Sequence, residues 1–304
     1  MARHRIKKYS RRTRSQYRKS HMPLVLAVIA FLLLTVIISV SIGIALSRRV
    51  EQSGQPQKKF DFERIDYSSG DKIVSAVEAY NLSKGANPSD YVAQGISDIS
   101  VCVRHSDGKL GFRFEAAEYY SIDTQGEASF ASVCNSAHQS GGRICAYMYL
   151  TSFAIEDKHL RGIAKAYELA LIDELGRSGA DDILILGLTV TDDNIDEVED
   201  FVARASLAAG KAPLGVSVDE EMLAMVSDGV YLAPRLREVC DYLALDLTAL
   251  TDGSVTDDKL EEALENNKYY IKSYPLRMLF ATGCSGLYSK ALAFGVTDMQ
   301  VVGK

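Results

Sequence analysis

The chain has 304 residues, 47% of them hydrophobic, and a formal net charge of −6 at pH 7. That length and apolar content suffice for one large domain with accessory segments. The first 22 residues hold nine of the 34 Lys and Arg residues and no acidic residue, so the remainder carries 25 basic and 40 acidic residues, a formal −15. An acidic body argues against nucleic acid as a partner, since phosphate binding needs clustered Lys and Arg.

Residues 1–22 form a basic tail, and residues 23–47 are predicted to form a transmembrane helix. Its core, Leu24–Leu46, is 23 uncharged and mostly apolar residues, enough to cross about 30 Å of hydrocarbon as a helix. Basic residues on its N-terminal side predict a cytoplasmic tail and an extracytoplasmic remainder. A cleaved signal peptide is the alternative, because Ala45 and Ser47 have small-x-small spacing. The apolar core exceeds the roughly 7 to 15 residues of the apolar region of a signal peptide, which favours a retained, single-pass anchor in the cell membrane.

Residues 48–59 have no apolar periodicity and are predicted to be a linker, followed by one extracytoplasmic domain over residues 60–304. The clearest unit in this domain runs from Ala180 to Asp219. It holds a strand-length apolar run, a helical pattern that Gly210 ends, and a second apolar run. Runs that are apolar on both sides indicate buried parallel strands covered by crossover helices.

The same alternation recurs through the domain, and the segment Asp71–Leu82 is predicted to be a helix. The predicted strands are Asp98–Val103, Arg143–Tyr149, Asp182–Gly187, Leu214–Val218, Tyr242–Leu247, Leu276–Ala281 and Asp298–Val302, with a weaker eighth at Phe60–Ile65. Their spacing of roughly 25 to 45 residues is typical of a (β/α)8 TIM-like barrel. An open doubly wound sheet is the alternative.

Candidate site residues follow from the alternation of side chains along each strand. In a barrel, one set of side chains faces the helices and the other faces the interior, and polar interior residues near the C-terminal strand ends reach the mouth. If the large aliphatic residues face the helices, the mouth contains Arg104, Tyr149, Asp219 and Asp246, and Tyr147 and Ser217 also face the barrel interior.

Two carboxylates across a barrel mouth suit glycoside hydrolysis, one as general acid and one as base or nucleophile. Asp219 and Asp246 are the candidate catalytic residues, and the other four are candidate substrate-binding residues. The alternative is structural. Arg104 would then pair with one of the carboxylates, and Asp219 would cap a helix that begins at Glu220.

No cofactor and no metal are predicted. Neither GxGxxG nor a P-loop occurs, and there is no CxxC or metal-spaced Cys/His cluster. The five cysteines are an odd number, and Cys102 and Cys145 lie in predicted strands, which argues against a disulfide framework. The absence of Trp weakens the case for a strong polysaccharide cleft, although the 16 Tyr residues supply other stacking rings.

From about Ser97 to the C-terminus, several short segments resemble motifs of a bacterial family of glycosyl hydrolase-like TIM barrels, and they occur in the same order along the chain. Val101–Gly108 is similar to the family's IDVKDD-x-G, and Gly179–Gly187 to GFDEIQxDYxRFP. Val216–Asp219 is similar to VSADVFG, and Cys240–Leu245 to VDYISPM. The resemblance implies a TIM barrel related to enzymes that cleave sugars.

The departures from the family pattern fall on the acidic strand-end residues. Cys102, His105 and Ser106 replace them in the first motif and Leu186 in the second, where the DYxRFP signature is absent. Asp219 is the one acid at a family position. One carboxylate cannot supply both an acid and a base, so the resemblance implies a barrel with lost or altered hydrolysis.

These observations lead to a first hypothesis and two alternatives. The first is a membrane-anchored extracytoplasmic barrel, glycoside hydrolase-like, that binds cell-envelope carbohydrate with lost or altered hydrolysis. The alternatives are an active glycoside hydrolase using Asp219 and Asp246, and a non-enzymatic scaffold of an envelope protein complex. The expected partners are the membrane, a cell-wall glycan and an envelope protein, and not nucleic acid.

Overall fold

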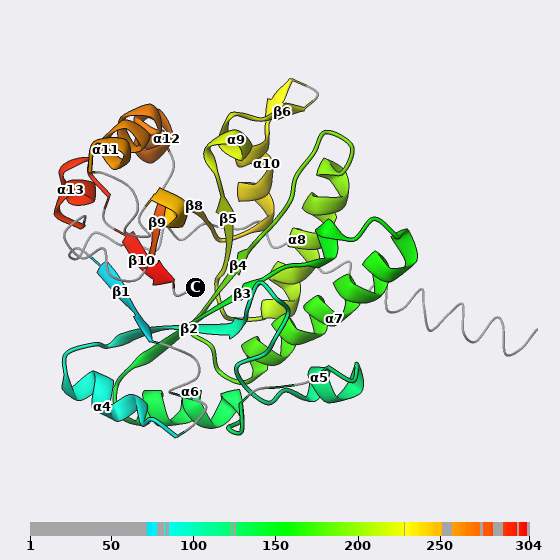
Figure 1. Ribbon diagram of the computed structural model, residues 1–304, viewed down its shortest axis with the longest axis vertical. Helices are drawn as coiled ribbons and strands as arrows, with labels where there is room; N and C mark the ends of the chain where they lie inside the picture. Colours follow the sequence, from blue (N-terminus) through cyan, green and yellow to red (C-terminus); the bar gives the residue numbers. More distant parts are fainter. Residues whose placement is uncertain are drawn as a thin grey trace, which may run out of the picture. The chain divides into compact units, whose positions relative to one another are not determined.

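Eight parallel strands close into a barrel in the order β1-β10-β9-β8-β5-β4-β3-β2 (Figure 1). They are β1 (Lys72–Val77), β2 (Asp98–Arg104), β3 (Arg143–Tyr149), β4 (Asp182–Leu186), β5 (Leu214–Val218), β8 (Tyr242–Asp246), β9 (Leu276–Ala281) and β10 (Asp298–Val302). This computed structural model describes residues 72–77, 82, 85–122, 124, 126–227, 229–250, 257–273, 276–281, 288–296 and 298–302. The predicted TIM-like α/β barrel is confirmed, and the closed ring excludes the open sheet.

The first strand of the barrel lies where the sequence predicted a helix. Within Asp71–Leu82, residues Lys72–Val77 form β1, which pairs with β10 on one side and β2 on the other. The helix prediction for this segment is therefore wrong. Two ladders of backbone hydrogen bonds that close the barrel outweigh the weak helical periodicity of a short segment, since tertiary context overrides propensity. The other candidate for this strand, Phe60–Ile65, lies outside the described residues.

Helices connect the strands and lie on the outside of the ring (Figure 1). They are α4 (Pro88–Ala93), α5 (Glu115–Tyr119), α6 (Phe130–Gln139), α7 (Lys158–Arg177), α8 (Ile195–Ala209), α9 (Glu220–Ala224), α10 (Leu232–Val239), α11 (Asp257–Asn266), α12 (Lys268–Ser273) and α13 (Tyr288–Ala293). Two 3-10 turns, η1 (Ser152–Ala154) and η2 (Thr248–Leu250), follow β3 and β8. A small hairpin of β6 (Val226–Ser227) and β7 (Val230–Tyr231) lies between α9 and α10.

None of the helices in the described ranges is long and apolar enough to cross a bilayer. The predicted anchor, Leu24–Leu46, lies outside these ranges. Its assignment stays a prediction.

Both faces of the strands are buried, and the contacts of their polar side chains show the predicted alternation. Ile99 and Val101 of β2 and Ile183 and Ile185 of β4 have no exposed surface and belong to the hydrophobic core. Ser100, between Ile99 and Val101, and Asp182, just before Ile183, point the other way, and these polar side chains contact others across the barrel interior. Parallel strands in a TIM barrel pack in this way, aliphatic toward the helices and layered inside.

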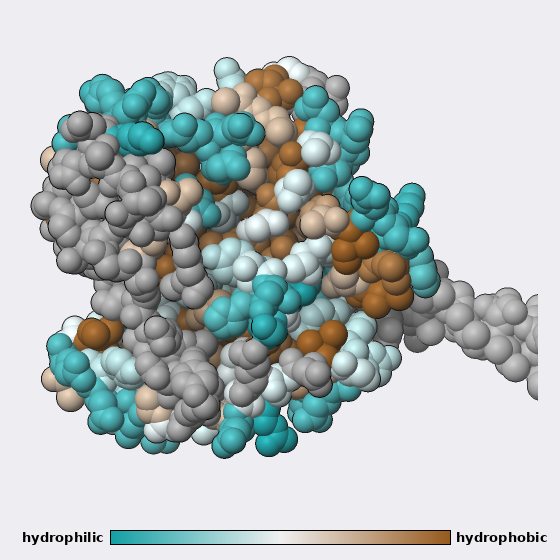
Figure 2. All heavy atoms as spheres, viewed as in Figure 1, coloured by the Kyte–Doolittle hydropathy of each residue, from teal (hydrophilic) through white to brown (hydrophobic). Residues whose placement is uncertain are grey.

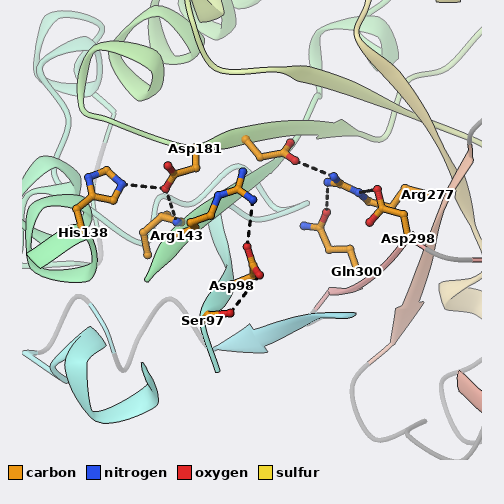
Figure 3. Close-up of polar contacts among 10 residues, drawn as sticks. Ser97, Asp98, His138, Arg143, Asp181, Arg277, Asp298 and Gln300 are labelled. Carbon is orange, nitrogen blue, oxygen red and sulfur yellow. Dashed lines mark hydrogen bonds and ion pairs between the residues drawn. The ribbon is translucent and has the colours of Figure 1, made fainter. Parts of the chain in front are cut away.

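A polar network fills the N-terminal half of the barrel interior, and Arg277 of β9 is its centre. The Arg277 guanidinium donates hydrogen bonds to Tyr242 Oη (2.7 Å), Gln300 Oε1 (2.9 Å), Asp182 Oδ2 (2.8 Å) and Asp298 Oδ2 (3.1 Å). Gln300 in turn donates to Ser100 Oγ at 2.8 Å. Tyr242, Asp298 and Gln300 are on the strands next to β9, whereas Asp182 is on β4, three strands away, so the Arg277–Asp182 pair crosses the floor of the barrel. Figure 3 shows Arg277 with Asp298 and Gln300.

Two aspartates, each just before a strand, accept a hydrogen bond from the backbone of the neighbouring strand at the N-terminal edge of the sheet. Asp181 Oδ2 accepts a hydrogen bond from Ile144 N (2.8 Å), and Asp241 Oδ2 accepts one from Leu214 N (2.7 Å). Asp181 also contacts His138 Nε2 of α6 at 2.8 Å (Figure 3). These contacts satisfy backbone donors at the N-terminal end of the barrel, which leaves the opposite end for the mouth.

Candidate functional site

Four consecutive strands, β3, β4, β5 and β8, form one arc of the C-terminal rim of the barrel. Tyr149 ends β3, Gly187 follows β4, Asp219 follows β5 and Asp246 ends β8. β5 and β8 are paired with Val218 opposite Leu245, so Asp219 and Asp246 come one residue later on adjacent strands. The structure thus brings both predicted carboxylates and Tyr149 to the same arc.

Both carboxylates hold local turns. Asp219 is exposed and caps α9, where its Oδ1 accepts a hydrogen bond from Met222 N at 2.8 Å. Asp246 is half-buried, and its Oδ1 accepts hydrogen bonds from Thr248 N (2.9 Å) and Thr248 Oγ1 (2.6 Å) at the start of η2. The structural alternative for Asp219, a helix cap, is therefore present.

Tyr147 and Tyr149 of β3 contribute to the inner wall near the mouth. Tyr147 is 2% exposed and hydrogen-bonds with Cys102 of β2. Tyr149 is half-buried, and burial, with smaller effects of Cys102 and the Asp246 charge, raises its pKa to about 12. The Tyr149 phenol is therefore neutral at physiological pH, and both tyrosines supply hydrogen-bonding aromatic rings.

Cys102 is also held in its neutral form. Burial raises the pKa of its thiol to about 12, against a smaller opposing effect of the Tyr147 hydrogen bond. A thiol must ionise to attack or to bind a metal, so Cys102 is not a nucleophile here. Where the resembling family has an acid, this chain has an inert small side chain.

Space for Tyr149 at the rim is provided by Gly187. Gly187 has φ +74°, and a Cβ there would lie 3.1 Å from Leu150 O and 3.6 Å from Tyr149 Cδ1. Glycine adopts this left-handed backbone without strain. A glycine here therefore permits the ends of β3 and β4 to approach closely, with the Tyr149 ring beside Gly187.

Ser217, the remaining predicted binding residue, is 6% exposed and lies two residues before Asp219 on β5. Its partner in the register with β8 is Ala244, which has no exposed surface. Ser217 and Ala244 each lie two residues before Asp219 and Asp246, so Ser217 is on the same face of the sheet, one layer deeper in the barrel.

Arg104 does not join the mouth arc, contrary to the prediction from alternation. The register between β2 and β3 shifts at Val103, so that Arg104 opposes Met148 and not Tyr149. Such a bulge adds one residue and turns the following side chain to the other face. Arg104 instead forms an ion pair with Glu168 of α7 (2.7 Å), so its predicted pairing with Asp219 or Asp246 is also wrong.

Two buried acids on α7 were not found from the sequence. Glu168 is fully buried against Arg104, and Glu174, 9% exposed, accepts hydrogen bonds from Glu115 N (2.8 Å) and Ala116 N (2.9 Å) at the start of α5. Their signal was weak, because Glu is common on exposed helix faces. The only signal in the sequence is that each acid lies beside apolar positions of α7, Glu168 next to Tyr167 and Glu174 next to Leu175.

An exposed apolar surface follows Asp219 in the chain. Val226, Val230 and Tyr231 of the β6–β7 hairpin are 47%, 48% and 51% exposed, and Figure 2 shows hydrophobic side chains gathered there. Only the short helix α9 separates Asp219 from this hairpin. Connections after barrel strands form the mouth side of TIM barrels, so the hairpin belongs to that side.

Comparisons with known proteins bear on the fold. No protein-family model and no curated protein sequence matches the chain. Among solved structures, a GH113 beta-1,4-mannanase is similar, with 9% identity and a TM-score of 0.52 over 77% of this chain and 88% of that one. A homocysteine methyltransferase from Escherichia coli has 12% identity and a TM-score of 0.49 (80% and 93% covered).

D-psicose 3-epimerase from Clostridium cellulolyticum H10 has 12% identity and a TM-score of 0.46 over 76% of this chain and 84% of that one. At such identities a likeness shows only the fold, because one barrel architecture hosts many chemistries. The chain is a TIM-like α/β barrel, with the fold found in a glycoside hydrolase.

Proposed function

We propose that the chain is a membrane-anchored, extracytoplasmic barrel that binds cell-envelope carbohydrate at its mouth and has lost or altered hydrolysis. The observation that carries this proposal is the chemistry of the rim arc. Tyr149 offers a neutral aromatic ring, Ser217 a hydroxyl and Asp246 a carboxylate. Aromatic rings cover apolar faces, while hydroxyl and carboxylate oxygens bind sugar hydroxyls, so the arc suits a polyhydroxylated ligand.

The use of the two carboxylates argues for binding over cleavage. A glycosidase needs one carboxyl as acid and one as base or nucleophile, both free to act on the glycosidic bond. Asp219 and Asp246 each hold a backbone turn through a hydrogen bond of 2.8 or 2.9 Å. Arg104, expected to support the charge, is paired with Glu168 away from them.

An active hydrolase is the second candidate, and one observation favours it. Asp219 and Asp246 follow adjacent strands at matching register, which is compatible with the roughly 5 to 9.5 Å between carboxyls that glycosidases use.

An envelope scaffold draws support from the exposed apolar hairpin at Val226, Val230 and Tyr231. For the scaffold, crosslinking in intact cells should give a discrete adduct that survives Asp219→Ala.

The membrane anchor and the extracytoplasmic location draw their support from the sequence. The uncharged segment Leu24–Leu46 follows a tail with nine basic and no acidic residues. An apolar segment of that length with basic residues on one side is inserted with the basic side in the cytoplasm. The barrel would then face the cell wall.

Binding is tested with the full chain in detergent micelles and purified peptidoglycan, alongside a panel of soluble wall polysaccharides. We expect the wild type to sediment with peptidoglycan or to be retained by a wall polysaccharide. Tyr149→Ala should weaken retention about tenfold or more, because a buried aromatic contact dominates such sites. The matched control is Tyr269→Ala, a tyrosine of α12 that is 71% exposed. No retention of the wild type, or equal retention of Tyr149→Ala, would refute the proposal.

A further inference from the structure

A buried ion pair lies directly behind the rim residue Tyr149. Glu168 of α7 has no exposed surface and Arg104 of β2 is 6% exposed. Glu168 Oε1 accepts hydrogen bonds from Arg104 Nη1 (2.7 Å), Thr151 N (2.8 Å) and Ser152 N (3.2 Å). The Arg104 guanidinium also donates to Tyr149 O (2.8 Å) and Thr151 Oγ1 (2.8 Å).

Apart from the ion pair itself, these hydrogen bonds all end on one short segment. It runs from Tyr149, the last residue of β3, to Ser152, the first residue of η1. A carbonyl and two backbone amides of four successive residues are therefore fixed by two side chains from other elements. The backbone from which the Tyr149 ring projects is thereby held in one position relative to the barrel wall.

A buried ion pair contributes little net stability to the packing of a helix on a strand. Replacing a buried ion pair by well-packed apolar residues is often neutral or stabilising, because the charges lose their hydration. Several buried polar atoms of the described residues that lack a hydrogen-bond partner gather in this cluster: Arg104 Nε, Ser152 Oγ, Tyr167 Oη and Glu168 Oε2. Packing alone therefore does not account for it.

What the charges supply, and apolar side chains cannot, is a set of directed hydrogen bonds to chosen backbone atoms. We infer that Arg104 and Glu168 are positioning residues for the carbohydrate site, acting through Tyr149 and touching no ligand themselves. This inference rests on the proposed function. It gives Arg104, expected at the mouth as a ligand-contacting residue, a different role in the same site.

The test uses a variant that removes the hydrogen bonds and leaves no unpaired charge. Arg104→Met combined with Glu168→Leu keeps the side-chain volumes, so the barrel should remain folded. The matched control is Glu174→Gln, a buried acid of the same helix that contacts α5 and not β3. Amide hydrogen exchange is measured on the ligand-free full chain, and retention by peptidoglycan is measured in parallel.

In the double variant, the Thr151 and Ser152 amides should exchange at least about tenfold faster, while the amides of Cys145 and Ala146 in β3 exchange as in the wild type. Glycan retention should fall at least about tenfold. Glu174→Gln should leave these values unchanged. Unchanged exchange at Thr151 and Ser152, or faster exchange along the whole of β3, would overturn the inference.

The two failures can be told apart. If the wild type binds no glycan, the proposed function is refuted. The exchange of the Thr151 and Ser152 amides still decides whether the pair positions the segment, because that measurement needs no ligand.

Discussion

Gly215 of β5 should not tolerate a methyl group, because the Tyr242 ring of the neighbouring strand β8 occupies that space. A Cβ at this position would lie 2.1 Å from Tyr242 Cζ, 2.2 Å from Cε2 and 2.6 Å from Oη. Real Cβ atoms do not approach carbon so closely, so the ring must move. It carries hydrogen bonds to Asp182 (2.5 Å) and from Arg277 (2.7 Å), and both would be disturbed.

The loss of stability in Gly215→Ala follows from these two effects. Overpacking of a filled core costs about 1 to 3 kcal/mol. One weakened hydrogen bond to a charged group adds about 1.5 to 3 kcal/mol. Taking middle values, the free energy of unfolding should fall by roughly 4 kcal/mol. For a domain of this size that lowers the melting temperature by about 8 to 16 °C.

The assay is thermal and denaturant unfolding of the full chain. Gly162→Ala is the matched control, since Gly162 is an exposed residue of α7 with no heavy atom within 4 Å of the added methyl. It should gain about 0.5 to 1 kcal/mol from helix propensity. Adding Tyr242→Leu to Gly215→Ala should cost less than the sum of the single changes. A loss below about 1 kcal/mol in Gly215→Ala would refute the account of the floor.

Three further outcomes are expected. Arg277→Met should lower stability in denaturant unfolding by about 3 to 5 kcal/mol, because it leaves the buried Asp182 unpaired, and a loss near zero would contradict this. Burial raises the pKa of Cys134 and Cys240 from 9.0 to about 12. Their contribution to stability is full below pH 9 and is lost as the pH rises from 9 to 12, so unfolding free energies that stay constant over that range would be inconsistent with it. Cell fractionation should place the full chain with membranes and a chain lacking residues 24–46 in the soluble fraction.

Most strands could be predicted because a buried parallel strand needs a run of apolar residues, and such runs are visible in the sequence. Continuous apolar runs such as Leu214–Val218 and Arg143–Tyr149 begin and end where the structure has them. β1 was missed because Lys72–Val77 is short, and a helical spacing of its apolar residues fits equally well. Only the partners on either side, β10 and β2, decide its conformation, and such long-range pairing leaves no local signal.

The candidate site could be predicted in part. The alternation of side chains along each strand predicted that Asp219 and Asp246 lie on the same rim. This prediction was possible because the alternation can be followed within the sequence of a single strand. Arg104 could not be placed, because one extra residue at Val103 reverses the alternation and nothing in the sequence marks the bulge. Its partner Glu168 lies 64 residues away on a helix, so the pair emerges only when α7 packs beside the end of β2.

Binding without cleavage is the central claim, and the release of reducing ends from a retained glycan tests it most directly. The full chain and Asp219→Asn are each incubated with purified peptidoglycan and wall polysaccharides, and new reducing ends are counted over time. The account predicts that the glycan is retained and that the wild type releases no more ends than Asp219→Asn. Accumulation of reducing ends with the wild type alone would contradict it and establish a hydrolase.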